Sequence, residues 1–303
     1  MPNNIHIYVF SFNRGRYLEN CLKSIQICIP ESSITIIDDQ SSDGLTLDVL
    51  ARLSQTCEVV TLEKDKFDDK TGGLYTNMNY AMYDVIKRKV KYVLFIQDDM
   101  QLVRPVTNSD LQRVDSFFEC NSSSVQYYPC FFKSSNMLNP DHWQLDESGT
   151  AYLQDINLPY SGFSAVGIFH VGRFINSFGE LNNIERDIDK KARMKGIQKG
   201  YAAYPFMMYL PFPISYRNRK RSFLHKFSER LAGAGFYPIQ LLEGTQSKRL
   251  FDRNPMDFPF AEEFLIVEGL NSKTKWTFVG GVSALHNQGG YRSIIGRFLR
   301  LIG

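Results

Sequence analysis

The sequence has few cysteines, no long apolar run and no excess of charge of one sign. Its five cysteines are odd in number and form no C-x-x-C pair. This pattern argues against a disulfide framework or a structural zinc site, and it favours a reducing compartment. A helix that spans a membrane needs about 20 consecutive apolar residues, and the sequence contains no such stretch. The N-terminus lacks the features of a signal peptide. We therefore expect a cytoplasmic protein that at most sits peripherally on the cytoplasmic face of a membrane.

The charge balance excludes a further class of partner. Among 303 residues there are 35 basic and 32 acidic side chains, which gives a net charge of +3. That is too even for a protein whose surface coats nucleic acid. No G-x-G-x-x-G follows the first apolar run, which disfavours a dinucleotide-binding dehydrogenase. The sequence contains neither a G-x-S-x-G motif nor a Cys–His signature, so no motif indicates a covalent nucleophile.

The first hundred residues alternate strand and helix patterns. Short apolar runs predict strands at 5–12, 34–37, 58–62 and 92–96, whereas helical spacing of apolar residues predicts helices at 17–25, 45–53 and 75–85. Strands that are apolar throughout are typical of parallel sheets buried on both faces. The pattern predicts an α/β fold built from βαβ units. From 102 to 160 the period is unclear, and we expect a loop or a few irregular strands over 121–160.

Two pairs of aspartates follow predicted strands. Asp38 and Asp39 end the second strand, and Asp98 and Asp99 end the fourth. The carboxyl ends of parallel strands share one edge of the sheet, where ligands bind. The four carboxylates should therefore face one crevice, together with a cation or a set of hydrogen-bond donors that offsets their repulsion.

The order of these motifs resembles a known family. Four motifs follow successive predicted strands. They are Ser11-Phe12-Asn13-Arg14, Asp38-Asp39-Gln40-Ser41-Ser42-Asp43, Gly72-Gly73 with Asn79, and Gln97-Asp98-Asp99. This order is similar to family 2 of the inverting GT-A glycosyltransferases, which have the nucleotide-diphospho-sugar transferase fold. The resemblance implies a mostly parallel central sheet flanked by helices, with a C-terminal helical extension. It divides the chain into a nucleotide-sugar half (1–104), an acceptor half (105–216) and a basic extension (217–303).

The resemblance also implies roles for single residues. Asp39 would accept a hydrogen bond from the imide of the base, and Asp98 would contact ribose or sugar. Mn²⁺ or Mg²⁺ would bind Asp99, with His286 reaching the metal or the diphosphate. Gln97 departs from the pattern because its amide carries no charge. The donor-binding set would be Ser11, Asn13, Arg14, Asp38, Asp39, Gly73, Asn79, Gln97 and Asp98.

The general base is expected near a second acidic motif. Setting Arg186-Asp187-Ile188-Asp189 on the family pattern makes Asp187 the base that takes the proton of the acceptor hydroxyl. A different register would make Glu185 the base. The reaction implied is a single displacement that transfers a sugar from a nucleoside-diphosphate donor, with UDP-sugars favoured and thymidine and guanosine donors open.

The acceptor implied is a glycan or a lipid-linked saccharide. The basic segment 217–230 and the tail 291–303 suggest contact with an anionic membrane surface. A solvated basic face, a helix packed on the core or a phosphate site would explain them as well. Two other functions stay open: a sugar nucleotidyltransferase, and a non-catalytic protein that binds nucleotides or a lipid surface on the same fold.

Overall fold

The first hundred residues fold as alternating strands and helices. The computed structural model describes residues 5–63, 73–133, 139–181, 184–214 and 223–269. The predicted elements are confirmed, each within a few residues of its expected bounds. They are β1 (Ile5–Ser11), α1 (Gly15–Cys28), β2 (Ser33–Asp38), α2 (Gly44–Leu53), β3 (Glu58–Thr61), α3 (Leu74–Arg88) and β4 (Tyr92–Gln97).

The later elements are shorter and more varied. They are β5 (Met100–Leu102), α4 (Asn108–Cys120), β6 (Gln126–Tyr128), the 3₁₀ helix η2 (Pro140–His142), β7 (Trp143–Leu145), β8 (Ala151–Gln154), β9 (Gly167–His170), α5 (Val171–Phe178), α6 (Glu185–Met194), β10 (Gly200–Ala202), β11 (Met207–Tyr209), α7 (Phe223–Ala232), α8 (Gly244–Asp252) and α9 (Ala261–Phe264).

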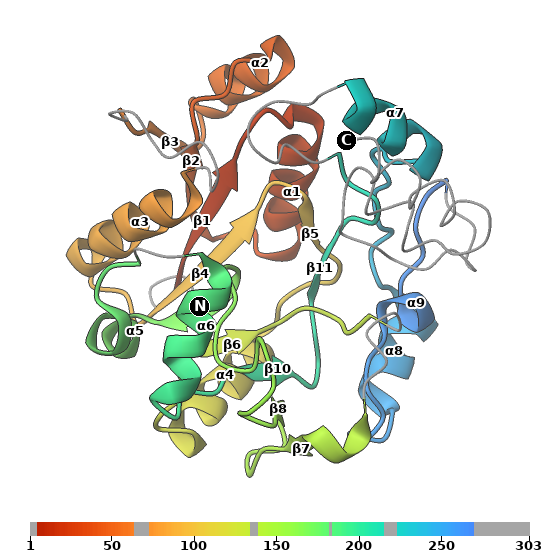
Figure 1. Ribbon diagram of the computed structural model, residues 1–303. Coiled ribbons are helices and arrows are strands. Elements are labelled where there is room, and N and C mark those ends of the chain that lie inside the picture. Colours follow the sequence, from red (N-terminus) through yellow and green to blue (C-terminus); the bar gives the residue numbers. More distant parts are fainter. Residues whose placement is uncertain (1–4, 64–72, 134–138, 182–183, 215–222, 270–303) are drawn as a thin grey trace.

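The central sheet is mixed, and its first half is parallel. The strand order is β3-β2-β1-β4-β9-β6-β10-β8-β7. The pairs β3–β2, β2–β1 and β1–β4 are parallel, whereas β9 runs antiparallel to β4. Helices flank this sheet, which confirms the predicted α/β class (Figure 1). A second, two-stranded sheet joins β5 to β11, directly after the Asp98–Asp99 pair.

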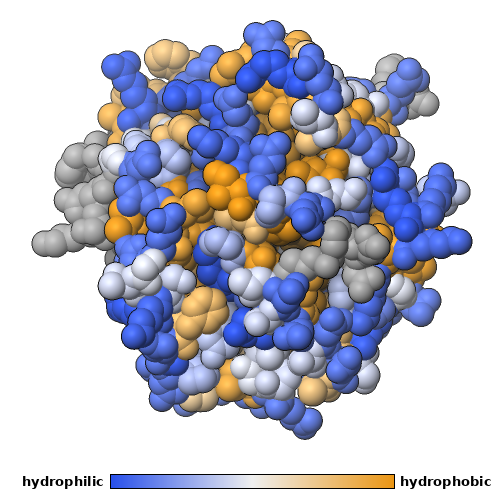
Figure 2. Space-filling view, turned by 180° about the vertical axis from the view of Figure 1, so that it is seen from behind, coloured by the Kyte–Doolittle hydropathy of each residue, from blue (hydrophilic) through white to orange (hydrophobic). Residues whose placement is uncertain are grey.

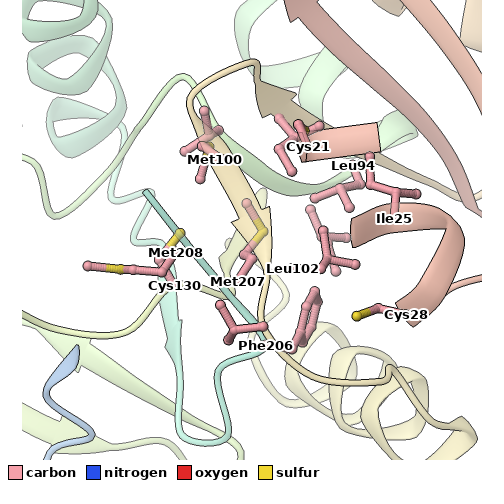
Figure 3. Close-up of a cluster of buried hydrophobic side chains, with 14 of the residues drawn as sticks. Cys21, Ile25, Cys28, Leu94, Met100, Leu102, Cys130, Phe206, Met207 and Met208 are labelled. Atoms are coloured by element: carbon pink, nitrogen blue, oxygen red, sulfur yellow. The ribbon is translucent and has the colours of Figure 1, made fainter. Parts of the chain in front are cut away.

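Each face of the sheet supports its own core. Successive side chains of a strand point to opposite faces, so Ile7 and Val9 of β1 pack with α1 and α2, whereas Tyr8 and Phe10 pack with α3, α5 and α6. In Figure 3, Ile25 and Cys28 of α1 point towards Leu102 of β5 and its neighbours. Burial on both faces explains why β1 and β4 are mostly apolar in sequence.

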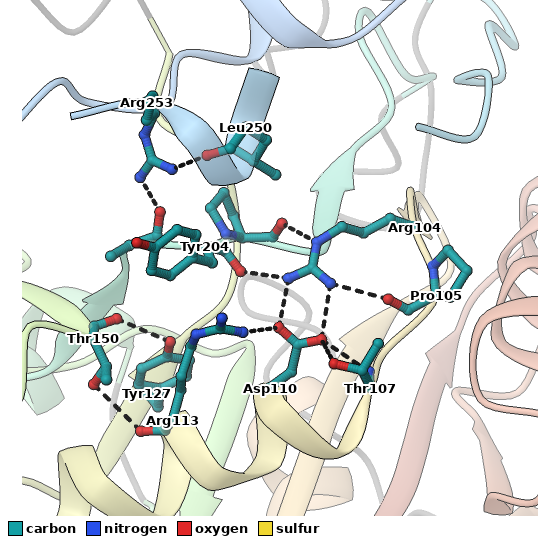
Figure 4. Close-up of polar contacts among 12 residues, drawn as sticks. Arg104, Pro105, Thr107, Asp110, Arg113, Tyr127, Thr150, Tyr204, Leu250 and Arg253 are labelled. Carbon is teal, nitrogen blue, oxygen red and sulfur yellow. Dashed lines mark hydrogen bonds and ion pairs between the residues drawn. The ribbon is translucent and has the colours of Figure 1, made fainter. Parts of the chain in front are cut away.

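Helix α4 lies within the stretch whose period was unclear. Thr107 and Asp110 form a reciprocal capping box at its start. Asp110 also binds both terminal nitrogens of the buried Arg104 guanidinium, at 2.9 and 2.7 Å. Arg104 in turn donates to the carbonyl oxygens of Tyr204 and Pro205 (Figure 4). This pair fixes the chain after β5 to the segment that precedes β11.

One face of the molecule carries both polar and apolar side chains (Figure 2). On the face behind the view of Figure 1, apolar side chains gather near the middle of the face and polar ones surround them (Figure 2). In the part of the chain that the structure describes, no helix is both long and apolar enough to cross a membrane. All five cysteines are free thiols.

Candidate active site

The candidate site lies at the carboxyl ends of β2, β1 and β4, and we call this edge of the sheet the crevice. Ser11 pairs with Asp38 across β1 and β2, and Phe10 pairs with Gln97 across β1 and β4. One residue further on, Asp39 N–H donates to the Ser11 carbonyl at 2.8 Å and Asp98 N–H donates to the Phe10 carbonyl at 3.0 Å. The prediction that both aspartate pairs meet at one edge is therefore confirmed.

Arg14 is the cation that offsets the second aspartate pair. Its Nη1 lies 3.0 Å from Asp98 Oδ1 and 2.7 Å from Asp99 Oδ2. Asp98 Oδ2 accepts a further bond from Phe12 N–H at 3.0 Å. Burial raises the pKa of Asp98, although the charge of Arg14 opposes this shift. Burial disfavours the Arg14 cation, yet the carboxylates of Asp99 and Asp98 raise its pKa, so it stays charged.

Two residues predicted to bind the sugar donor, Asp38 and Asn13, hold the loops at this edge of the sheet together. Asp38 accepts bonds from the backbone N–H and the hydroxyl of Ser41, at 2.7 and 2.6 Å. Asn13 has a left-handed φ of 52°, and its Oδ1 accepts from the N–H groups of Ser42 and Asp43. Asp43 accepts from Thr46 N–H at the start of α2. The side chains of Asp38 and Asn13 thus hold the turn after β2 against the turn after β1.

Asp39 lies against the start of α3. Its Oδ2 accepts from Gly73 N–H at 3.0 Å, and its Oδ1 accepts from Asn77 Nδ2 at 3.3 Å. Asn79 is engaged elsewhere, because its Nδ2 and Oδ1 both bind the backbone of Leu181, at 2.9 and 2.8 Å. The structure therefore places Asn77 in the crevice. The only sequence signal for Asn77 is its place one helical turn after Gly73.

Several polar atoms in this crevice are buried without a hydrogen-bond partner. Ser11 Oγ, Arg14 Nε, Asn77 Oδ1 and Asp99 Oδ1 all fall in this class. Such atoms are rare in folded proteins, because leaving one unsatisfied costs about 1–3 kcal/mol. Their concentration at the carboxyl edge of parallel strands, where ligands bind in open α/β sheets, indicates a polar ligand site.

The donor set at Asp99 fits a divalent cation in part. Asp99 Oδ1 is a buried acceptor without a partner, and Arg14 Nη1 holds the other oxygen of this carboxylate at 2.7 Å. Mg²⁺ and Mn²⁺ commonly take one or two carboxylates, with water and phosphate oxygens completing the shell. The other predicted ligand, His286, and also Gly72 lie outside the described residues. Gln97 ends β4 half-buried.

The two candidate bases differ in their surroundings. Glu185 opens α6, and its Oε1 accepts from Ala165 N–H at 3.2 Å. Burial raises the pKa of Tyr209, and the negative charges of both Glu185 and Asp99 act on it in the same direction. Tyr209 is therefore close enough to both carboxylates for their charges to act on it. The Asp187 side chain is 47% exposed, and its nearest cation is Arg186 at 3.7 Å.

Asp189 has a structural role instead. It is 1% exposed and accepts from the N–H groups of Tyr160, Gly162 and Phe163. Arg193 pairs with it at 3.0 Å. Asp189 therefore holds the loop before β9 against α6.

Comparisons with known proteins give structural matches only. No protein-family model matches the chain, and no curated protein matches it in sequence. Among solved structures, S. aureus TarS 1–349 has a TM-score of 0.46 and 15% identity over 68% of this chain and 60% of that chain. S. aureus TarS has a TM-score of 0.48 and 15% identity, over 82% of this chain and 42% of that chain. A Pyrobaculum calidifontis mannosyltransferase in complex with GDP-Man and Mn²⁺ has a TM-score of 0.40 and 13% identity, over 77% of this chain and 62% of that chain.

Proposed function

We propose that this chain is an inverting glycosyltransferase that binds a nucleoside-diphosphate sugar at the carboxyl edge of β2, β1 and β4. The observation that carries the proposal is the set of buried polar atoms without partners in this crevice, on Ser11, Arg14, Asn77 and Asp99. A donor that offers phosphate oxygens, hydroxyls and base N–H groups would satisfy them. The resemblance of the strand-end motifs to those of family 2 GT-A glycosyltransferases supports the same class of ligand.

The departing diphosphate needs positive charge. Arg14 has N–H groups that bind no carboxylate, and α1 begins one residue later. Both features favour the binding of an anion such as a diphosphate. A Mn²⁺ or Mg²⁺ ion held by Asp99 Oδ1 would neutralise the leaving group. Arg14 holds the other oxygen of Asp99 and so fixes the orientation of that carboxylate.

We propose Glu185 as the general base. Its carboxylate is held by Ala165 N–H, and its charge acts on Tyr209 together with that of Asp99. The Asp187 side chain is instead 47% exposed and lies 3.7 Å from Arg186. The Glu185 carboxylate would take the proton of the acceptor hydroxyl while that oxygen bonds to the anomeric carbon. The bond from the anomeric carbon to the phosphate oxygen breaks on the opposite face, and the nucleoside diphosphate leaves with the electron pair.

The test is the release of nucleoside diphosphate from a panel of sugar donors, with Mn²⁺ present. Glu185→Gln should leave nucleotide affinity unchanged and slow release by about 10²–10⁴-fold, the usual contribution of a general base. Asp187→Asn is the matched control and should release at the wild-type rate. Slow release in Asp187→Asn with normal release in Glu185→Gln would reverse the assignment. Tight binding without any release would favour the non-catalytic alternative.

We further propose that the acceptor lies at an anionic membrane surface. Helix α7 exposes Phe223 (86%) and Phe227 (44%), whose rings stack 6.5 Å apart. Lys226 and Arg230 are exposed on the same helix. Aromatic rings beside cations suit the interface of an anionic bilayer. Phe223→Ser with Phe227→Ser should weaken co-sedimentation with phosphatidylserine vesicles, and unchanged binding would contradict this surface. The tail 291–303 lies outside the described residues.

A further inference from the structure

Asn77 is a polar residue of the crevice whose acceptor atom has no partner. It is 1% exposed on α3, and its Nδ2 donates to Asp39 Oδ1 at 3.3 Å. A carboxylate can only accept hydrogen bonds, so the amide nitrogen must face Asp39. Oδ1 then points away from that carboxylate, and it is buried without a hydrogen-bond partner. Asn77 therefore orients Asp39 and keeps one acceptor for something else.

The neighbouring Asn79 cannot serve in this way. Its Nδ2 and Oδ1 bind the carbonyl and the N–H of Leu181, at 2.9 and 2.8 Å. Both ends of its amide are used to fix α3 to the segment after α5. The two asparagines are two residues apart on one helix, so they form a natural pair of test and control.

The crevice has a direction that places the two ends of a nucleotide. Asp99 follows β4 and Asp39 follows β2, with β1 between these strands. Neighbouring strands are about 4.8 Å apart, so the two aspartates lie roughly 10 Å apart along the edge. This distance matches the reach from the diphosphate of a nucleotide to its base. With the phosphates at Arg14 and Asp99, the base lies at Asp39 and Asn77.

We propose that Asp39 and Asn77 together recognise guanine, so that the sugar donor is a guanosine diphosphate sugar. This inference rests on the proposed function. Guanine has a ring N–H next to an amino group, and these two donors match the Asp39 carboxylate and Asn77 Oδ1. Uracil and thymine have carbonyl oxygens on both sides of their single N–H, so an oxygen would face Asn77 Oδ1. Cytosine has an amino group but no ring N–H.

The test uses GDP, inosine diphosphate and UDP as probes, titrated by calorimetry with Mn²⁺ present. Inosine diphosphate differs from GDP only by the missing amino group. The wild-type protein should bind GDP about tenfold more tightly than inosine diphosphate, the size expected for one neutral hydrogen bond. It should also bind GDP more tightly than UDP. In Asn77→Ala the ratio of the affinity for GDP to that for inosine diphosphate should fall to about one. In Asn79→Ala this ratio should stay near ten.

The outcomes separate this inference from the proposed function. Equal wild-type affinity for GDP and inosine diphosphate, or tighter binding of UDP, would overturn the guanine assignment and leave a nucleotide site in place. Binding of none of the three nucleotides would overturn both. An unchanged ratio in Asn77→Ala would show that another residue reads the amino group. The wild-type comparison needs no variant, so it decides the question even if one variant fails to fold.

Discussion

The Arg104–Asp110 ion pair offers a prediction about stability whose size follows from its geometry. Both side chains are 2% exposed, and Asp110 is the only carboxylate that the described contacts place on this guanidinium. Asp110→Asn keeps the size of the side chain but leaves the Arg104 charge buried without a counter-charge. Breaking one partner of a buried pair costs about 3–5 kcal/mol. Because asparagine keeps one acceptor oxygen, we expect a loss near the lower end of that range.

The assay is urea unfolding at pH 7, with Glu119→Gln as the matched control on the same helix. Glu119 is exposed, so that variant should unfold within about 0.5 kcal/mol of wild type. Burial opposes the charge of Asp110, but its bonds with Arg104 hold its pKa below the ordinary 3.8. The stabilisation is thus present above pH 3.8 and is lost as the pH falls further, so the gap to Asp110→Asn should narrow there. A loss below about 1 kcal/mol at pH 7 would refute this account of the pair.

Three further predictions concern other positions. Asn79→Ala should lower the free energy of unfolding by about 1–3 kcal/mol, because both backbone groups of Leu181 lose their partner; a wild-type urea midpoint would contradict this. Gly15→Ala would place a Cβ 2.8 Å from the backbone of α2, whereas the nearest atom at Gly172 is 3.8 Å away. We expect Gly15→Ala to lose about 1–3 kcal/mol in calorimetry and Gly172→Ala almost none. Burial lowers the pKa of Lys199 from 10.5 to about 8, so wild-type stability should rise relative to Lys199→Met between pH 8 and 10.5; parallel pH profiles would contradict it.

The first half of the fold could be predicted because its signals are local. Strands β1 and β4 are buried along almost their whole length and β2 over its last four residues, so their sequences are mostly apolar. The buried polar residues His6 and Thr35 are hydrogen-bonded to each other at 2.9 Å. The helices between them bury one face each, which gives the helical spacing that α1 shows. The convergence of the aspartate pairs then follows from parallel strands alone, without knowledge of any contact.

The second half was less predictable because its elements are short and depend on distant partners. Strands β6, β7 and β8 have three or four residues each, too few to establish a period of two. Helix α4 has a capping box at Thr107 and Asp110. Asp110 in turn holds Arg104, which donates to the carbonyls of Tyr204 and Pro205, about a hundred residues further along the chain. Such contacts leave no trace in one sequence.

The candidate site also has a part that could be predicted from the sequence and a part that could not. The sequence predicts that a cation or a set of hydrogen-bond donors must offset the aspartates, and the structure identifies Arg14 as the cation bound to Asp98 and Asp99. It does not predict that Asn79 binds Leu181 while Asn77 faces Asp39, because two asparagines two residues apart look alike until α3 is docked. For the same reason, the choice between Glu185 and Asp187 depended on a register that the sequence left open.

Thermal unfolding with added nucleotides shows directly whether Asp99 belongs to a nucleoside-diphosphate site. The measurement compares wild type with Asp99→Asn in the presence of GDP, UDP, dTDP and CMP, each with and without Mn²⁺. A ligand at about 100 times its dissociation constant stabilises by roughly 2.7 kcal/mol, or about 5 °C for a chain of this size. We predict such a shift for one nucleoside diphosphate in wild type, only with Mn²⁺, and its loss in Asp99→Asn. If no nucleotide raises the unfolding temperature of the wild type, the protein has no such site.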